Sequence, residues 1–395
     1  IRTPMNAIIG LTSLARKMDL PPKPQDYLAR IESSSRSLLG IINDILDFSK
    51  IEAGKLDLEK SEFALAGVLD RMSDIFGERS LDKMIEFNIF SSPDIPGGLV
   101  GDPLRLEQVL INLTTNAFKF TDKGEVAILV QSLPAPPGKT RLLFTVRDTG
   151  IGINPDKIPL LFEAFTQEDG STTRKYGGTG LGLTISQRLV RMMDGEITVK
   201  SEPGRGSEFS FEAIFDHPHA APEASPDQNL QGLNVLVVDD NETAREILDA
   251  YLRSLGARPV TAASGAEALA ILRAERSTTD LVVLDWRMPG QDGLEVLKTI
   301  KSEPSLQNLP VIMMTAFGRD DIHLQALEAG ANSFLTKPIK LSGLLEAALS
   351  ALGRSAPDPD RVETGLDQEE LFTRRLAGAR VLLVEDNLIN QEVAR

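Results

Sequence analysis

Apolar residues at helical spacing mark two runs at the N-terminal end of the chain. The runs cover residues 5–17 and 25–55, and a proline cluster at 21–24 separates them. In the second run the a and d positions of a heptad repeat form an apolar seam. Ser35 takes one of these positions, and the others are Leu28, Ile31, Leu38, Ile42 and Ile45. Because two helices cannot bury such a seam, we predict that residues 1–56 form a helical hairpin that dimerises into a four-helix bundle.

The region from 57 to 216 mixes both kinds of pattern. Short apolar or alternating runs predict strands at 85–90, 125–131, 141–147, 195–200 and 207–215. Longer runs predict helices at 65–82, 103–119 and 181–193. Strands and helices in this order indicate an α+β sandwich.

Residues 232–353 have a different organisation, because apolar strands at 235–238, 281–284 and 311–314 alternate with helical stretches. This alternation predicts a doubly wound parallel α/β sheet. Segments rich in proline precede and follow it, and we interpret 217–231 and 354–378 as linkers.

Polar residues follow the first, third, fourth and fifth strands of this parallel sheet. These residues are Asp239, Asp240, Asp285, Thr315 and Lys337. Since the carboxyl ends of parallel strands meet at one crevice, three carboxylates, a hydroxyl and an ammonium should converge there. A divalent cation would offset the excess negative charge at such a site.

A glycine-rich stretch lies before the predicted helix at 181–193. Gly178, Gly180 and Gly182 lack Cβ atoms, so the backbone N–H groups between them can approach phosphate oxygens at a helix N-terminus. Asn112 and Asn116 lie four residues apart on a predicted helix, where two amide oxygens can face one cation.

Asp148 ends an apolar run and is followed closely by Gly150 and Gly152. A carboxylate in such a turn can accept a hydrogen bond from an exocyclic amine, and the glycines let the backbone pass close to a flat ring. The three stretches together predict a nucleotide site.

In this order the residues resemble the N, G1, F and G2 boxes of the histidine-kinase ATP-binding domain within the GHKL ATPases. Phe162 and Phe165 match the F box, and residues 204–207 match the closing glycine turn. The resemblance implies ATP and Mg²⁺ as cofactors. It implies that Asn116 holds Mg²⁺ beside Asn112, that Lys119 and Arg174 meet phosphates, that Asp148 reads adenine and that 167–179 form a lid.

Residues 1–10 resemble the end of the histidine-kinase H box. In that family the phosphoacceptor His stands just before the equivalent of Ile1, so we expect that histidine upstream of this chain. The histidines at 217, 219 and 323 lie elsewhere. Thr3 corresponds to a family position that orients water for phosphatase action, and an N-cap before Pro4 is the structural alternative.

Residues 232–353 resemble the receiver domain of response regulators. The resemblance implies that Asp285 is the phosphoacceptor and that it binds Mg²⁺ together with Asp239 and Asp240. It also implies that Thr315 and Lys337 meet phosphoryl oxygens and that Phe334 is a switch aromatic. Residues 380–387 repeat 234–241 almost residue for residue, so we expect 379–395 to begin a second receiver.

Composition narrows the choice of partners and compartment. The 395 residues include 57 acidic and 42 basic side chains, and the net charge of −15 disfavours nucleic acid as a partner. The sequence contains no cysteine, which fits a reducing compartment. We expect a cytoplasmic portion that only missing N-terminal segments would anchor in the inner membrane.

We therefore expect part of a hybrid sensor histidine kinase, a transferase that moves the γ-phosphoryl group of ATP to a histidine and then to Asp285. Its expected partners are a second copy of itself and a downstream phosphotransfer or response-regulator protein. Two alternatives stay open, a GHKL hydrolase and a phosphorelay scaffold. Against the hydrolase, position 112 is Asn where those enzymes carry a Glu.

Overall fold

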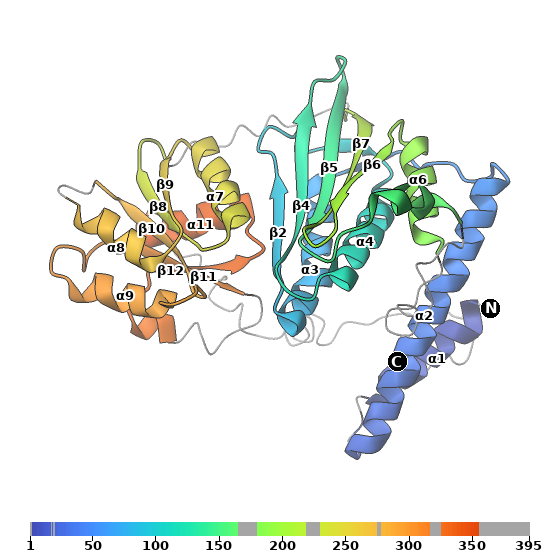
Figure 1. The fold of residues 1–395 in the computed structure, drawn as a ribbon, viewed down its shortest axis with the longest axis horizontal. Helices are drawn as coiled ribbons and strands as arrows, with labels where there is room; N and C mark the ends of the chain where they lie inside the picture. Colours follow the sequence, from blue (N-terminus) through green and yellow to red (C-terminus); the bar gives the residue numbers. More distant parts are fainter. Residues whose placement is uncertain are drawn as a thin grey trace, which may run out of the picture. The chain divides into compact units, whose positions relative to one another are not determined.

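The computed structural model describes residues 2–16, 18, 20–164, 180–218, 230–274, 278–316 and 325–354 (Figure 1). The chain divides into two compact units. The first contains the N-terminal hairpin and residues 162–185, and the second contains residues 58–161 and 186–362 with both β-sheets. The predicted lid at 167–179 and the predicted start of a second receiver at 379–395 lie outside the described residues.

The hairpin consists of α1 (Arg2–Arg16) and α2 (Pro22–Glu52), which confirms the prediction. Pro22 stands in the first turn of α2, where its missing N–H costs no hydrogen bond. Much of the predicted seam is uncovered in a single chain, since Ile31, Leu38 and Ile45 each expose nearly half of their surface. The face of α2 that is buried carries Glu32 and Ser35.

The first sheet has seven strands in the order β1-β3-β7-β5-β4-β2, and β6 also pairs with β7. All pairings are antiparallel except that of β2 with β4. The strands are β1 (Ser61–Phe63), β2 (Glu86–Ser91), β3 (Leu99–Gly101), β4 (Glu125–Leu133), β5 (Lys139–Asp148), β6 (Ile197–Glu202) and β7 (Gly206–Asp216). The sequence did not predict β1 and β3, because three residues are too few to show a period.

Helices α3 (Leu65–Lys83) and α4 (Pro103–Phe120) bury their apolar faces in the same core as this sheet (Figure 1). Phe76 of α3, Phe118 of α4 and Phe87 of β2 form an aromatic cluster with ring centroids 5.3 to 6.0 Å apart. Asp102 caps the N-terminus of α4 by accepting from the Arg105 N–H. A short 3-10 helix, η1 (Pro155–Phe162), and α6 (Gly182–Met192) complete this part of the chain.

The second sheet is fully parallel, in the order β12-β11-β10-β8-β9. Its strands are β8 (Asn234–Val238), β9 (Arg258–Ala262), β10 (Leu281–Asp285), β11 (Val311–Ala316) and β12 (Ser333–Lys337). The helices described around it are α7 (Glu242–Ser254), α8 (Gly265–Arg273), α9 (Gly293–Ser302) and α11 (Leu341–Ala351). One apolar core lies with α7 and α11 and the other with α8 and α9, as expected for a doubly wound fold.

None of the helices in the described ranges combines the length and hydropathy that a membrane crossing requires.

Candidate functional site

Helix α4 carries the three residues that the sequence assigned to a cation and to phosphates. Asn112 donates from Nδ2 to the Oγ atom of Ser186 on α6 at 2.9 Å, which fixes the orientation of its amide. Asn116, one turn further on, is half-buried. Lys119 extends its Nζ atom over the Phe120 ring, 4.9 Å from the centroid, and burial lowers the pKa of Lys119.

Asp148 occupies the last position of β5 and exposes only 7% of its surface. Its carboxylate accepts from the Gly150 N–H at 2.8 Å and from the backbone N–H of Ser207. Burial raises the pKa of Asp148, while these two donors oppose the rise. A buried carboxylate held by backbone donors is well suited to read a hydrogen-bond donor on a ligand.

The turn after Asp148 packs directly on the end of α4. The Ile151 N–H donates to the Phe120 carbonyl at 3.2 Å, and a Cβ atom at Gly150 would lie 2.3 Å from that same oxygen. At Gly206, with φ at +106°, a Cβ atom would lie 1.9 Å from the Asp148 carbonyl. Only glycine permits these approaches, which bring the Asp148 turn and the asparagine helix together.

Lys83, at the end of α3, fixes the other side of this helix end. Its Nζ atom donates to the Phe118 carbonyl at 2.6 Å and to the Thr121 carbonyl at 3.4 Å. Cations near the C-terminus of a helix stabilise its unpaired carbonyls. Lys83 therefore positions the helix that carries Asn112 and Asn116.

The second candidate site lies at the carboxyl end of the parallel sheet, where the structure brings together the residues predicted from the sequence. Carboxylate oxygens of Asp239, Asp240 and Asp285 lie within 4.8 Å of one another, which fits the oxygen-ligand set of a divalent cation. The Lys337 Nζ atom lies 2.8 Å from Asp239 and 3.1 Å from Asp285. Thr315, at the end of β11, is buried beside them.

The electrostatics of this site explain why a cation would stabilise it. Burial raises the pKa of Asp285 to about 7, since the Lys337 ammonium only partly offsets the burial and the carboxylates of Asp239 and Glu86. Burial also raises the pKa of Asp239 and of Asp240. The pKa of Lys337 is raised by Asp285, Asp239 and Glu86 although its burial acts in the opposite direction.

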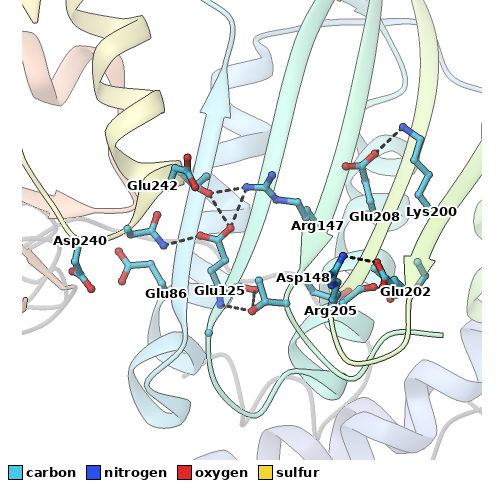
Figure 2. A pocket seen from close by; sticks show the side chains of 17 residues that line it. Glu86, Glu125, Arg147, Asp148, Lys200, Glu202, Arg205, Glu208, Asp240 and Glu242 are labelled. Atoms are coloured by element: carbon cyan, nitrogen blue, oxygen red, sulfur yellow. Dashed lines mark hydrogen bonds and ion pairs between the residues drawn. The ribbon is translucent and has the colours of Figure 1, made fainter. Parts of the chain in front are cut away.

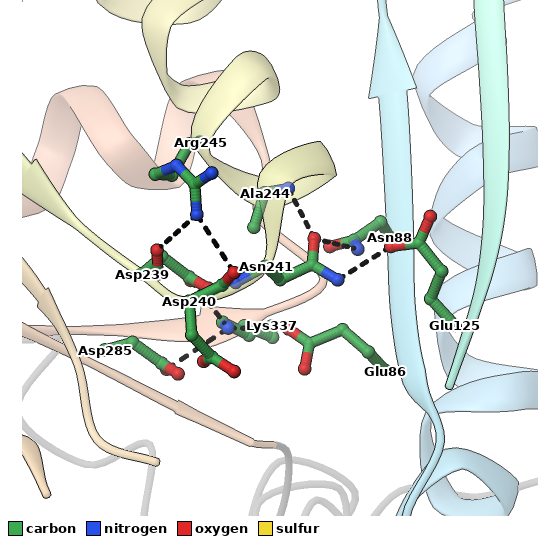
Figure 3. Close-up of polar contacts among 10 residues, drawn as sticks. All are labelled: Glu86, Asn88, Glu125, Asp239, Asp240, Asn241, Ala244, Arg245, Asp285 and Lys337. Carbon is green, nitrogen blue, oxygen red and sulfur yellow. Dashed lines mark hydrogen bonds and ion pairs between the residues drawn. The ribbon is translucent and has the colours of Figure 1, made fainter. Parts of the chain in front are cut away.

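The turn between β8 and α7 is held rigid around these carboxylates. Arg245 donates from Nη1 to the carbonyls of Asp239 and Asp240 at 2.7 and 2.9 Å (Figure 3). Asn241 caps α7 by accepting from the Ala244 N–H at 2.7 Å. The two aspartates are thus placed by backbone contacts that no strand-end pattern reveals.

A hollow of about 910 Å³ lies in the second unit beside β5 and β7 (Figure 2). Acidic side chains such as Glu86, Glu125 and Asp240 line it together with Arg147 and Lys200. Asp148 also lines this hollow, whereas Asn112 and Asn116 do not.

Three family models match the chain in succession. Residues 1–54 match the His Kinase A (phospho-acceptor) domain. Residues 101–217 match the histidine kinase-, DNA gyrase B- and HSP90-like ATPase, and residues 235–349 match the response regulator receiver domain. The nucleotide site lies within the second of these matches and the acidic cluster within the third.

The chain belongs to the hybrid sensor histidine kinases. It is 44% identical over 247 residues to the signal transduction histidine-protein kinase BarA of Escherichia coli, an alignment that covers 62% of this chain and 27% of BarA. It is 35% identical over 385 residues to the sensor histidine kinase AruS of Pseudomonas aeruginosa, covering 97% of this chain and 38% of AruS. The chain thus spans well under half the length of these relatives.

Among solved structures, this hybrid kinase chain resembles full-length ShkA in complex with AMPPNP. The likeness covers 100% of this chain and 76% of ShkA, with a TM-score of 0.71 and 29% identity. The predicted fold classes, a hairpin, a nucleotide-binding sandwich and a receiver, are confirmed.

Several residues to which the sequence assigned a role lie apart from the two candidate sites or outside the described residues. Thr3 is exposed in the first turn of α1, and Gly180 precedes α6, which begins at Gly182. Arg174, Gly178 and Phe165 lie outside the described residues. Phe334 packs against the receiver core from β12.

Sequence reasoning missed Ser186, Lys83 and Glu86. Ser186 contacts Asn112 from 74 positions away, and Glu86 contacts Lys337 from 251 positions away. No local pattern marks such pairs. Lys83 carried a weak signal, because basic residues are common in the last turn of a helix.

Proposed function

We propose that this chain is the catalytic and first receiving part of a phosphorelay kinase. ATP with Mg²⁺ binds beside α4 and the Asp148 turn, and its γ-phosphoryl group is transferred to a histidine that precedes Ile1 in the full-length protein. The receiver then takes the phosphoryl group onto Asp285.

The observation that carries the proposal is the pairing of two different sites in one chain. One is a buried carboxylate, Asp148, in a turn that packs on the helix carrying Asn112 and Asn116. The other is an acidic cluster around Asp285 with a buried ammonium, Lys337. A nucleotide site supplies a phosphoryl group, and the carboxylate cluster with a cation can accept one.

In the nucleotide site, Asn116 would hold Mg²⁺ and Lys119 would meet phosphate oxygens, as the family resemblance implies. Asn112 holds its neighbour α6 through Ser186, so it links the cation helix to the helix that follows the glycine loop. Bound Mg²⁺ would neutralise phosphate charge. Asp148 contributes by orienting the adenine ring through its fixed carboxylate.

In the receiver, Asp239, Asp240 and Asp285 would hold Mg²⁺, which supplies charge neutralisation during transfer. Lys337, 3.1 Å from Asp285, and the buried Thr315 would meet phosphoryl oxygens. The uncovered seam of α2, which includes Ile31 and Leu38, is the surface for a second copy of the chain, so the active kinase is a homodimer. A downstream phosphotransfer or response-regulator protein would receive the phosphoryl group.

Incubation of the full-length protein with γ-labelled ATP tests the proposal. We expect label in two linkages, an acid-labile and base-stable phosphohistidine and an acyl phosphate on Asp285. Asp285→Asn should keep the first label and lose the second. Asp292→Asn is the matched control, because Asp292 caps α9 and asparagine caps a helix equally well. Release of free phosphate without any protein label would contradict the proposal.

A further inference from the structure

The edge strand of the nucleotide-domain sheet lies against the strand ends of the receiver, within the second unit. Strand β2 is the last in its sheet order and pairs with β4. Asn88 of β2 donates to the Asn241 Oδ1 atom at 3.3 Å, and Glu125 of β4 accepts from the Asn241 Nδ2 atom at 2.7 Å (Figure 3). These contacts reach the turn that carries Asp239 and Asp240.

Polar contacts continue along the start of α7. The Thr243 hydroxyl donates to Glu125 at 2.8 Å and accepts from Arg147 at 2.7 Å. Arg147 also pairs with Glu125 at 3.1 Å (Figure 2). The side chains of β4 and β5 therefore form a closed network with the receiver helix.

An aromatic pair forms the apolar centre of this contact. Phe90 of β2 stacks on Tyr251 of α7 with ring centroids 5.5 Å apart, and it packs against the receiver core. Tyr251 is buried, and its hydroxyl accepts from the Ser91 N–H at 3.1 Å. An aromatic centre with a polar rim is the composition of a specific protein interface.

Glu86, at the start of β2, enters the acidic site itself. Its carboxylate lies 2.6 Å from the Lys337 Nζ atom, compared with 2.8 Å for Asp239 and 3.1 Å for Asp285 (Figure 3). The Lys337 side chain is 11% exposed, so this ammonium is enclosed by carboxylates from both domains. Glu86 of the nucleotide domain thus forms an ion pair with the Lys337 ammonium, the group that a phosphoryl oxygen would need to contact.

We propose that β2 is a docking surface for the unphosphorylated receiver, and that phosphorylation of Asp285 releases it because the phosphoryl group replaces Glu86 at Lys337. This inference rests on the proposed role of Asp285 as phosphoacceptor. A phosphoryl group brings a charge of about −2, repels Glu86 and pairs more strongly with the ammonium. Release exposes the α7 face to a phosphotransfer partner.

Asp285 can also be phosphorylated by a small phosphoryl donor, acetyl phosphate. A carboxylate oxygen of Asp285 forms a bond to the phosphorus of acetyl phosphate, the bond from phosphorus to the acetyl oxygen breaks, and acetate leaves with the electron pair. Glu86 opposes this step while it is docked, because it adds negative charge near the incoming phosphoryl group and competes for Lys337.

The rate of Asp285 labelling by acetyl phosphate and Mg²⁺ tests the role of Glu86 in the complete chain. Glu86→Gln should label about fivefold faster or more, which is a typical coupling between two sites. Glu62→Gln is the matched control, since Glu62 lies on β1 at the opposite edge of the same sheet. Equal rates in all three proteins would overturn the inference and leave the proposed function intact. Absence of label from every protein would overturn both.

A cross-link measures docking directly. Asp70 of α3 and Lys340, which precedes α11, form an ion pair at 2.7 Å and are about half exposed. Because these 395 residues contain no cysteine, Asp70→Cys with Lys340→Cys gives this chain one reactive pair for a short bis-maleimide. We expect efficient cross-linking before acetyl phosphate is added and at least a severalfold loss afterwards, with no loss when Asp285→Asn is also present. Cross-linking that phosphorylation leaves unchanged would overturn the proposed release.

Discussion

The Lys337 Nζ atom lies 3.1 Å from a carboxylate oxygen of Asp285, although the strands that end in these residues do not pair with each other. Strand β11 separates them, and its Thr315 is buried between the two ends. The contact therefore depends on the sheet order rather than on any local sequence. It leaves one ammonium to balance several carboxylates.

Replacing Lys337 by Met should destabilise the receiver by about 3 kcal/mol in the absence of a divalent cation, because removal of one partner leaves buried charges unpaired. Urea unfolding followed through the single tryptophan, Trp286, measures this change. Lys298→Met on the exposed face of α9 is the control and should shift stability by less than about 0.5 kcal/mol. An equal, small effect of both substitutions would show that the ammonium does not stabilise the site.

Mg²⁺ binding should change the fluorescence of Trp286, which follows Asp285 directly. The Trp286 backbone is fixed, since its N–H donates to the Met314 carbonyl at 3.0 Å and its carbonyl accepts from the Gly293 N–H at 2.8 Å. The indole therefore reports charge and position changes at the adjacent carboxylate. Titration with MgCl₂ should give a saturable change that EDTA reverses.

Asp240→Asn provides the check on this fluorescence signal, since it removes one of the clustered carboxylates. The substitution should weaken the apparent affinity for Mg²⁺ by about tenfold or more. An unaltered titration curve would mean that the cation binds elsewhere.

Asp148→Asn should weaken adenine-nucleotide binding by about tenfold or more, because the amide presents a donor where the exocyclic amine of adenine needs an acceptor. Isothermal calorimetry with Mg-ATP measures the affinity. Asp194→Asn is the matched control. Asp194 is exposed with φ at +60°, a conformation that asparagine also adopts readily. Undiminished binding by the Asp148 variant would contradict the nucleotide assignment.

The hairpin should lose stability in acid because of Glu32. Arg16 and Arg36 hold the pKa of Glu32 below its usual value of about 4.3, with Arg16 at 2.8 Å from its carboxylate and Arg36 at 2.7 Å. A depressed pKa stabilises the fold above pH 4.3, and this stabilisation is lost as the pH falls through the folded-state pKa.

Hydrogen exchange of peptides from α1 and α2 measures this effect. Glu32→Gln should speed exchange at pH 7, and the difference from the wild type should shrink steadily below about pH 4. Asp26→Asn removes an exposed pair with Arg30 and should change little at either pH. A constant difference across the range would exclude Glu32 as the titrating group.

The architecture was predictable from the sequence because its signals are local. Strand ends such as Asp285 and Lys337 follow apolar runs, and the parallel order of the receiver then brings them together. The same holds for Asp148, which ends a long strand before a glycine turn. Their proposed roles stay predictions, and so does the role of Asn116.

The remaining parts of both sites were not predictable, for physical reasons. Strands β1 and β3 have three residues each, and their pairing depends on partners far along the chain. The Asn112 contact with Ser186 and the Glu86 contact with Lys337 arise from packing between elements, which a single sequence does not record. Such contacts determine the orientation of a side chain in its site.

The corner between α3 and β2 is very short. Helix α3 ends at Lys83, Met84 takes the left-handed conformation, and the chain enters β2 at Glu86. Before this corner, Lys83 donates a hydrogen bond to the carbonyl end of α4, the helix that carries Asn112 and Asn116. After it, Glu86 forms an ion pair with Lys337. With consecutive Cα atoms about 3.8 Å apart, the Cα atoms of Lys83 and Glu86 lie at most about 11 Å apart. While the receiver is docked, one short bend therefore connects the helix that carries Asn112 and Asn116 to the ammonium of Lys337.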